Sequence, residues 1–262
     1  MKKRITLIAL ALLMALLGVT ALADISITRK DLGAVKGLDQ NVTNVLVILQ
    51  DGEVSDTIML ASIDSKTGRA VMTRIDGDLI VPVVNGGYEA ALKDVYMLGD
   101  KKSKGLLVAA TLNQLLSLNI NTYIALDVSI LPELAEVFGV VNMQYDEAEA
   151  AALGGIVGTN GLSGEQLLGY VRLRLDSDSP ARSRGYDALM QLLYQGLHSG
   201  NIGDMMGLGT KLLKSMDTNV NVMSAMTLAS AVQAGEDRRE ALVDAVMSEE
   251  DVRAMMRTTI YE

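Results

Sequence analysis

Short apolar runs separated by polar turns occupy the first part of the chain beyond its N-terminal segment. Residues 44–50 (NVLVILQ), 56–64 (DTIMLASID) and 70–76 (AVMTRID) each have the length of a strand, and the turn dipeptide DG follows the first run. Runs of this kind between turn residues are typical of buried strands. The turn SKTGR, with Gly68 suited to a positive φ, joins the second and third runs. We therefore predict that these two runs form a β-hairpin.

Helical periodicity begins in the middle of the chain and alternates with further strands. One apolar helix face is formed by Val108, Leu112, Leu115 and Leu116. Residues 121–128 and 140–146 again have the composition of strands. Between them, ILPELAEVFG predicts a helix that begins near Pro132 and ends at Gly139. Strands interleaved with helices predict an α/β fold with a central β-sheet flanked by helices.

The chain changes character from about residue 182, where the pattern is helical and rich in Ala, Leu and Met. This pattern predicts a helical C-terminal portion. We expect a main domain over residues 43–200, preceded by a polar lead-in over 24–42. Residues 201–262 are then expected to form a helical extension that packs on that domain. Glycine-rich GGIVGTNG, within the main domain, predicts a flexible loop without the lysine of a phosphate-binding loop.

The N-terminus has the layout of an export signal. MKKR is followed by the apolar run ITLIALALLMALLGVTALA, which ends in Ala21-Leu22-Ala23. A basic start, an apolar run and an A-x-A site are typical of a secretory signal peptide. The run is also about long enough to span a bilayer if it is retained. Residues 1–23 are therefore predicted to be a signal peptide or an N-terminal membrane anchor, with the rest of the chain on the extracytoplasmic side.

Composition excludes several kinds of chemistry. The chain of 262 residues has a formal net charge of −9, no cysteine and one histidine, His198. A catalytic thiolate, a disulfide framework and a cysteine-based zinc site are therefore excluded, as is a histidine-rich metal site. We expect His198 to lie at a helix end, where imidazolium suits the helix dipole, or on the surface. The acidic balance argues against nucleic acid as a partner.

Four arginines are nevertheless clustered in the stretch GYVRLRLDSDSPARSRGYD, namely Arg172, Arg174, Arg182 and Arg184. The intervening DSDSP is turn-forming, so we expect the chain to double back and bring the two pairs together. Guanidinium groups match the oxygens of phosphate and carboxylate. The alternative is that these arginines form surface ion pairs with Asp176, Asp178 and Asp187.

A second cluster is acidic. Asp51 ends the first predicted strand, Asp56 begins the next, and Asp76 and Asp78 lie where the third strand ends. Antiparallel pairing can bring such strand ends together, and carboxylates there bind hard cations such as Mg²⁺. The alternative is that they are ordinary turn aspartates. Together, the two clusters suggest a pyrophosphate held between Mg²⁺ and arginines.

Three blocks of the sequence resemble the LytR–CpsA–Psr (LCP) family. They begin with NVLVILQDGEVSDTIMLASIDSKTGR, continue with GLLVAATLNQLLSLNINTYIALDV and end with LSGEQLLGYVRLR. The resemblance implies an α/β domain with a hydrophobic pocket for a polyprenyl chain. It also implies Mg²⁺-assisted transfer of a glycopolymer from a polyprenyl-pyrophosphate carrier to peptidoglycan, at the outer face of the cell membrane.

The resemblance also implies roles for individual residues. Asp51 and Asp56 match the metal-linked aspartates, and Asp78 matches the aspartate of the Pro-Arg-Asp turn. The pyrophosphate-binding arginines match Arg172, Arg174 and Arg182. Arg184 is a further candidate for substrate binding.

The chain departs from the family pattern at two places. Asp76-Gly77-Asp78 stands where the family has Pro-Arg-Asp, and Ser179-Pro180-Ala181-Arg182 stands where it has Asp-Phe-Gly-Arg. Loss of one phosphate-binding arginine can cost on the order of 10² in rate. We therefore expect a phosphotransferase of reduced or altered activity. The alternatives are a non-catalytic protein that binds polyprenyl lipid or wall polymer as a scaffold or regulator, and an unrelated exported α/β protein.

Overall fold

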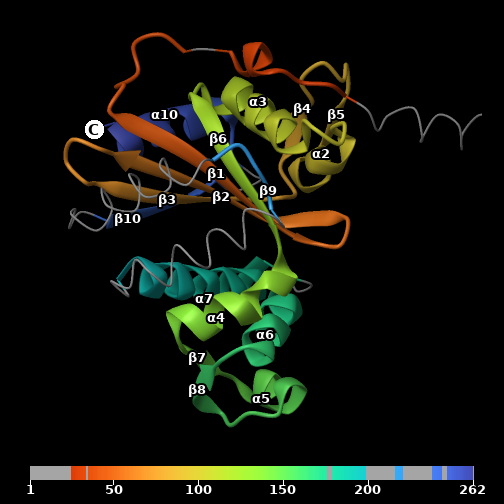
Figure 1. Cartoon of the computed structure of the whole chain (residues 1–262), viewed down its shortest axis with the longest axis vertical. Coiled ribbons are helices and arrows are strands. Elements are labelled where there is room, and N and C mark those ends of the chain that lie inside the picture. Colours follow the sequence, from red (N-terminus) through yellow and green to blue (C-terminus); the bar gives the residue numbers. More distant parts are fainter. Residues whose placement is uncertain are drawn as a thin grey trace, which may run out of the picture.

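The centre of the fold is a six-stranded mixed sheet with strand order β10-β3-β2-β1-β6-β9 (Figure 1). The computed structural model describes residues 25–33, 35–175, 179–198, 216–220, 238–243 and 247–261. The strands are β1 (Val42–Asp51), β2 (Val54–Asp64), β3 (Ala70–Ile75), β6 (Ile120–Asp127), β9 (Asp217–Thr218) and β10 (Arg238–Val243). Helices cover both faces of this sheet (Figure 1). The predicted α/β class is therefore confirmed.

The predicted hairpin is formed by β2 and β3, which pair antiparallel from Ile58↔Ile75 to Ile63↔Ala70. Gly68 adopts φ 73° in the connecting turn, and its amide donates to the Asp64 carbonyl at 2.8 Å. A left-handed backbone is least costly for glycine, which explains the residue at this position.

One face of the sheet is covered by α2 (Leu92–Leu98), α3 (Lys104–Leu116) and α10 (Glu249–Tyr261). The core on this face includes Leu46, Ile48 and Leu60 of the sheet, which are fully buried. The predicted helix face at positions 108, 112, 115 and 116 is buried in α3. Its apolar periodicity therefore faces the sheet, as amphipathic packing requires.

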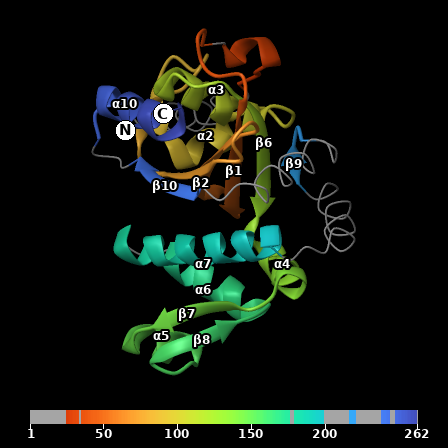
Figure 2. The same cartoon turned by 90° about the vertical axis from the view of Figure 1, so that its left-hand side faces the viewer.

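The opposite face lies against α4 (Leu131–Phe138), α6 (Glu165–Leu175) and α7 (Ser179–His198), with η2 (Val128–Ile130) leading into α4. The predicted helix over ILPELAEVFG is confirmed, because Pro132 lies in its first turn and Gly139 caps its end. Leu49 and Met59 are buried against these helices. Figure 2 shows α7 running along the length of this face.

A small hairpin unit projects beyond the layer formed by α4, α6 and α7 (Figure 2). It consists of β7 (Val141–Tyr145), α5 (Glu147–Leu153) and β8 (Gly158–Leu162). The sequence predicted β7 but treated the region of β8 as a flexible glycine-rich loop, and this is corrected by the β7–β8 pairing. Asn160 holds the turn before β8 in place, because its amide donates to the carbonyls of Ile156 and Gly158 at 2.6 and 2.9 Å. The remaining short elements are η1 (Arg29–Leu32), β4 (Ile80–Pro82) and β5 (Glu89–Ala91).

The C-terminal part contains two strands that the helical pattern did not predict. β10 pairs parallel to β3 from Arg238↔Ala70 to Val243↔Ile75, and β9 pairs antiparallel to β6. The residues of β10 favour helix, but the edge of β3 offers unpaired backbone groups that another strand satisfies. Tertiary pairing therefore overrides local propensity here. Ser248 and Asp251 cap the start of α10 through a 3.2 Å bond from the Asp251 amide to the Ser248 hydroxyl.

The lead-in segment packs on the domain, because Ile27 and Leu32 are buried in the core between the sheet and the helices α2, α3 and α10. Residues 1–23 lie outside the described residues. Across the part of the chain that the structure describes, no helix is both long and apolar enough to cross a membrane.

Candidate functional site

Asp51 and Arg172 meet at the end of β1. Asp51 is the last residue of β1, and Arg172 projects from α6. The Arg172 guanidinium donates from Nε to both carboxylate oxygens of Asp51, at 3.3 and 3.2 Å, and from Nη2 to Oδ1 at 3.1 Å. The two side chains are 45% and 35% exposed, so a solvent-borne ligand can reach them. One predicted metal ligand and one predicted phosphate ligand are thus brought into direct contact.

Asp127 joins this pair from the end of β6. The parallel register aligns Gln50 with Asp127, so the carboxyl ends of β1 and β6 lie side by side. Hydrogen bonds from the Ser129 hydroxyl and backbone amide, with a smaller effect from the charge of Arg172, lower the pKa of Asp127. We call Asp51, Asp127 and Arg172 the strand-end cluster. Sequence reasoning missed Asp127, because only the parallel pairing of β1 with β6 places it beside Asp51.

Three further predicted residues are placed by their backbone only. Asp56 lies in β2, Arg174 in the last turn of α6 and Arg182 in the first turn of α7. Their side chains lie outside the described residues. The helix α6 runs through both Arg172 and Arg174 and ends at Leu175. Positions 172 and 174 are therefore separated by about 200° around a helix, because each residue turns the chain by about 100°.

Asp78 lies in the turn after β3, in a different set of contacts. Its carboxylate forms a 2.7 Å ion pair with Lys93 of α2, and its amide donates to Asp76 at 3.0 Å. Within the described ranges, no group of three acidic or histidine side chains is close enough to hold a metal ion. The magnesium site and its ligands Asp51 and Asp56 therefore remain a prediction.

Arg184 forms ion pairs with two acidic residues that the sequence analysis did not consider. Its guanidinium forms ion pairs with Asp146 at 3.3 Å and with Glu149 at 2.9 Å, and it donates to the Gln144 carbonyl. The side chain of Glu149 is 1% exposed and also accepts from the Asp146 amide at 2.6 Å, so Arg184 supplies a compensating positive charge to a buried carboxylate. These contacts tie α7 to the β7–α5 unit and favour a structural role for Arg184.

Arg74 is a charged residue that the sequence interpretation passed over. It projects from β3 toward α7, where its guanidinium lies 5.1 Å from the centre of the Tyr186 ring. Burial raises the pKa of the neighbouring Asp187, while Arg74 and Arg184 act in the opposite direction. The sequence does contain a signal for Arg74: it lies two residues after Met72 in a predicted strand, so it places a charge on an otherwise apolar strand face.

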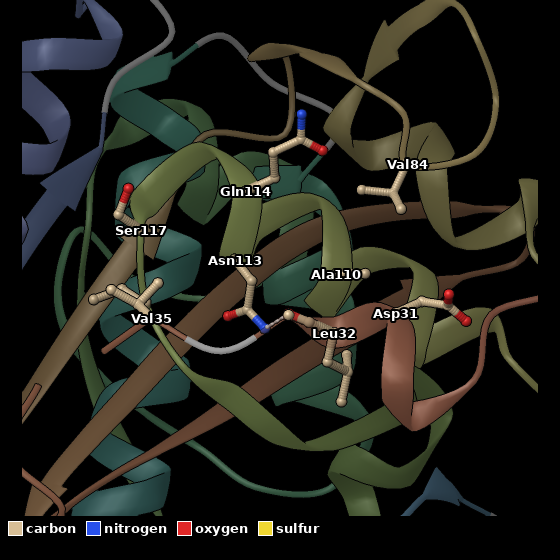
Figure 3. A pocket seen from close by; sticks show the side chains of 10 residues that line it. Asp31, Leu32, Val35, Val84, Ala110, Asn113, Gln114 and Ser117 are labelled. Carbon is tan, nitrogen blue, oxygen red and sulfur yellow. Dashed lines mark hydrogen bonds between the residues drawn. The ribbon is translucent and has the colours of Figure 1, made fainter. Parts of the chain in front are cut away.

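A cavity of about 360 Å³ lies on the other side of the sheet, between η1 and α3 (Figure 3). Asn113 is the buried polar side chain in its wall, and its amide donates to the carbonyls of Leu32 and Ile120 at 3.0 and 3.1 Å. Its oxygen accepts from the Ile120 amide at 2.6 Å. Asn113 therefore stabilises the fold here and presents no polar group to a ligand.

The chain matches the LytR_cpsA_psr family over residues 24–258, and it belongs to this family. Among curated proteins, it is similar to Biofilm regulatory protein A of Streptococcus mutans, with 23% identity over 189 residues. The match covers 65% of this chain and 46% of that protein, so the chain spans about half the length of this curated relative.

Solved structures share the fold. TagT bound to LI-WTA has a TM-score of 0.68 at 16% identity, covering 90% of this chain and 99% of that one. B. subtilis TagV has a TM-score of 0.64 at 18% identity, covering 85% of this chain and 98% of that one. The protein gbs0355 of Streptococcus agalactiae has a TM-score of 0.64 at 20% identity, covering 78% and 77%.

Proposed function

We propose that the protein is a cell-wall glycopolymer transferase, which moves a polymer from a polyprenyl-diphosphate carrier to peptidoglycan at the outer face of the cell membrane. The observation that carries this proposal is the strand-end cluster, in which an accessible guanidinium fork is positioned by a carboxylate. Membership of the LCP family and the likeness to TagT, whose structures hold WTA ligands (wall teichoic acid), support the same class of substrate.

The chemistry of the strand-end cluster suits a diphosphate and a divalent cation together. A guanidinium binds phosphate oxygens with the same bidentate geometry that Arg172 uses on Asp51. When a diphosphate binds Arg172 in place of Asp51, the Asp51 carboxylate becomes available to a cation. Mg²⁺ prefers one or two carboxylates with phosphate and water oxygens, so Asp51 and Asp127 fit it. Asp56, which the sequence predicted as a ligand together with Asp51, is a further candidate.

Bound Mg²⁺ would neutralise negative charge on the diphosphate that links polymer and carrier. Arg172 would bind and orient that diphosphate. The acceptor hydroxyl attacks the polymer-linked phosphorus and gives its proton to solvent. The bond from that phosphorus to the carrier phosphate breaks, and polyprenyl monophosphate leaves. The low pKa of Asp127 keeps this carboxylate ionised at neutral pH, so it adds negative charge that attracts the cation.

The carrier's apolar chain requires a surface of its own, and the sheet face toward α7 offers one. The apolar residues Val47, Ala61, Met72, Ile124 and Leu126 share this face and are only half-buried. The same strands bury Leu46, Ile48 and Leu60 completely on the opposite face. Leu49 and Met59 on this face are buried, but the incomplete burial of the five residues around them supports a prenyl-binding surface beside the strand-end cluster.

A second candidate function is a non-catalytic protein that holds the carrier or a wall polymer. One observation favours it: the turn that carries the family's arginine has Gly77 here, and Asp78 is engaged by Lys93. The chain thus lacks the arginine side chain that the family pattern places in this turn. Binding through Arg172 is common to both functions, whereas turnover separates them.

The test of the shared step is binding of a fluorescent short-chain polyprenyl diphosphate to the full-length chain in detergent, with and without Mg²⁺. Arg172→Ala removes a charge-assisted bidentate contact worth about 1.5–3 kcal/mol, so we expect roughly 10- to 100-fold weaker binding. The matched control is Arg257→Ala, which removes an exposed arginine from α10 in the other helical layer. Equal affinities of the two variants would contradict the proposal.

A further inference from the structure

A hollow of about 300 Å³ lies at the beginning of β1 and β6, at the opposite end of these strands from Asp51 and Asp127. The last turn of α10 forms one side of it. We call it the amide hollow, and its lining consists of Leu38, Asp39, Gln40, Val42, Thr43, Asn44, Asn119, Asn121, Thr122 and Tyr261. Its volume is at the lower end of the range of small-ligand sites, about 300–1,000 Å³.

The chemistry of this lining points to an uncharged ligand rich in hydroxyl groups. Seven of the ten lining residues carry amide or hydroxyl side chains, and Asp39 is the one charged residue among them. The lining has no cation to attract phosphate, and a single carboxylate is too few to hold a divalent ion. Amides donate and accept hydrogen bonds together, which matches a sugar hydroxyl that does the same.

Part of the lining is a rigid wall. The Asn119 side chain accepts from the Val35 amide at 2.7 Å and donates to the Val35 carbonyl at 3.0 Å. Asn44 is 2% exposed and accepts a 2.7 Å hydrogen bond from the Ser62 hydroxyl. Asn44 also donates to the Tyr261 hydroxyl at 3.3 Å. This network fixes the phenol at the edge of the hollow with its own O–H still able to donate.

The rim of the hollow contains an irregularity in the sheet. β1 and β6 pair as Asn44↔Ile120 and then Val45↔Thr122, so the register shifts and Asn121 has no partner in β1. The Asn219 amide donates to the Asn121 carbonyl at 2.8 Å, which holds the bulge, and the Asn121 residue is exposed. Bulges redirect a side chain and recur at binding sites. Asn121 therefore differs from the wall asparagines in having its amide presented to solvent at the hollow.

We propose that the amide hollow is a binding site for a neutral saccharide. Rim groups of Gln40, Thr43 and Asn121 would hydrogen-bond the sugar hydroxyls, and Tyr261 would supply an aromatic edge and one O–H donor. The site is distinct from the strand-end cluster, because the length of β1 separates them by about 30 Å. It goes beyond the transferase proposal and does not depend on it, since it requires binding alone.

The test uses the full-length chain in a polyoxyethylene detergent, because glycoside detergents carry sugars that would compete. A β-linked N-acetylglucosamine tetramer and an α-linked glucose tetramer are titrated by isothermal calorimetry and saturation-transfer NMR. We expect saturable binding of at least one tetramer. Gln40→Ala with Asn121→Ala is expected to weaken it about tenfold, which equals about 1.4 kcal/mol. Asn142→Ala, an exposed asparagine of β7, is the matched control and should leave the affinity unchanged.

Three results would overturn the proposal. The first is no saturable binding of either tetramer by the unaltered chain. The second is equal affinity in the rim double variant and the Asn142→Ala control, with both variants retaining the melting temperature of the unaltered chain. The third is displacement of the bound tetramer by inorganic phosphate or by a divalent cation alone, which would assign the hollow to an ion. Arg172→Ala should leave saccharide binding unchanged, so failure of this site and failure of the transferase proposal are distinguishable.

Discussion

The ion pair between Arg184 and Glu149 allows a sharp prediction about stability. Arg184→Ala removes the guanidinium from a carboxylate that is 1% exposed, at 2.9 Å. Breaking a buried ion pair by removing one partner costs about 3–5 kcal/mol, because the remaining charge is left uncompensated. Arg184 itself is 33% exposed, so water can replace part of its contribution. We therefore expect a loss of about 3 kcal/mol in the free energy of unfolding.

Urea unfolding followed by far-UV circular dichroism measures this loss. With a slope of about 3 kcal/mol/M, the midpoint should fall by about 1 M. Glu149→Gln in the Arg184→Ala background removes the buried charge and should recover about half of the loss. Arg257→Ala should stay within about 0.5 kcal/mol of the unaltered chain. A loss below about 0.5 kcal/mol in Arg184→Ala, or no recovery in the double variant, would refute this reasoning.

Two further predictions concern the packing and the turns of the sheet domain. A Cβ at Gly105 would lie 2.2 Å from the Tyr123 ring, so Gly105→Ala should lower stability by about 1–3 kcal/mol in thermal unfolding. A Cβ at Gly169 would have its nearest atom 3.8 Å away, so Gly169→Ala should leave stability unchanged. Equal losses of stability in the two variants would contradict the packing argument. The Thr67 hydroxyl and neighbouring amides lower the pKa of Asp64, so its contribution is complete above its ordinary value of 3.8 and is lost as pH falls through the lower folded value. Asp64→Asn should flatten the acid loss of stability in that window, and parallel pH profiles would contradict this assignment.

Elements with strong local signals were predictable from the sequence. The apolar face of α3, the proline and glycine that bound α4, and the turn at Gly68 each specify their structure within a few residues. β10 could not be predicted in this way, because its residues favour helix and only the edge of β3 makes them a strand. β8 was obscured by its glycines, whose side chains give no alternation to recognise.

The candidate site was predictable in kind but not in its contacts. Residue type and resemblance identified Asp51 and Arg172, and the structure joins them directly. The contribution of Asp127 depends on the parallel pairing of β1 and β6, which no local pattern encodes. Arg184 was predicted to bind substrate, but a long-range contact with the buried Glu149 gives it a structural explanation. Clustering of arginines in the sequence therefore identifies candidate site residues. The contacts that each arginine makes in the structure distinguish an arginine that can bind a ligand from one that stabilises the fold.

The central claim is that Arg172 serves ligand binding and turnover, whereas Arg184 serves stability. Arg172→Ala should change the free energy of unfolding by less than about 1 kcal/mol, because its pair with Asp51 is exposed. The most direct measurement incubates the full-length chain with a polyprenyl-diphosphate-linked glycopolymer, an acceptor glycan and Mg²⁺, and follows release of polyprenyl monophosphate. We predict metal-dependent release that is lost in Arg172→Ala and retained in Arg257→Ala. Release by Arg172→Ala at the rate of the control would contradict the account.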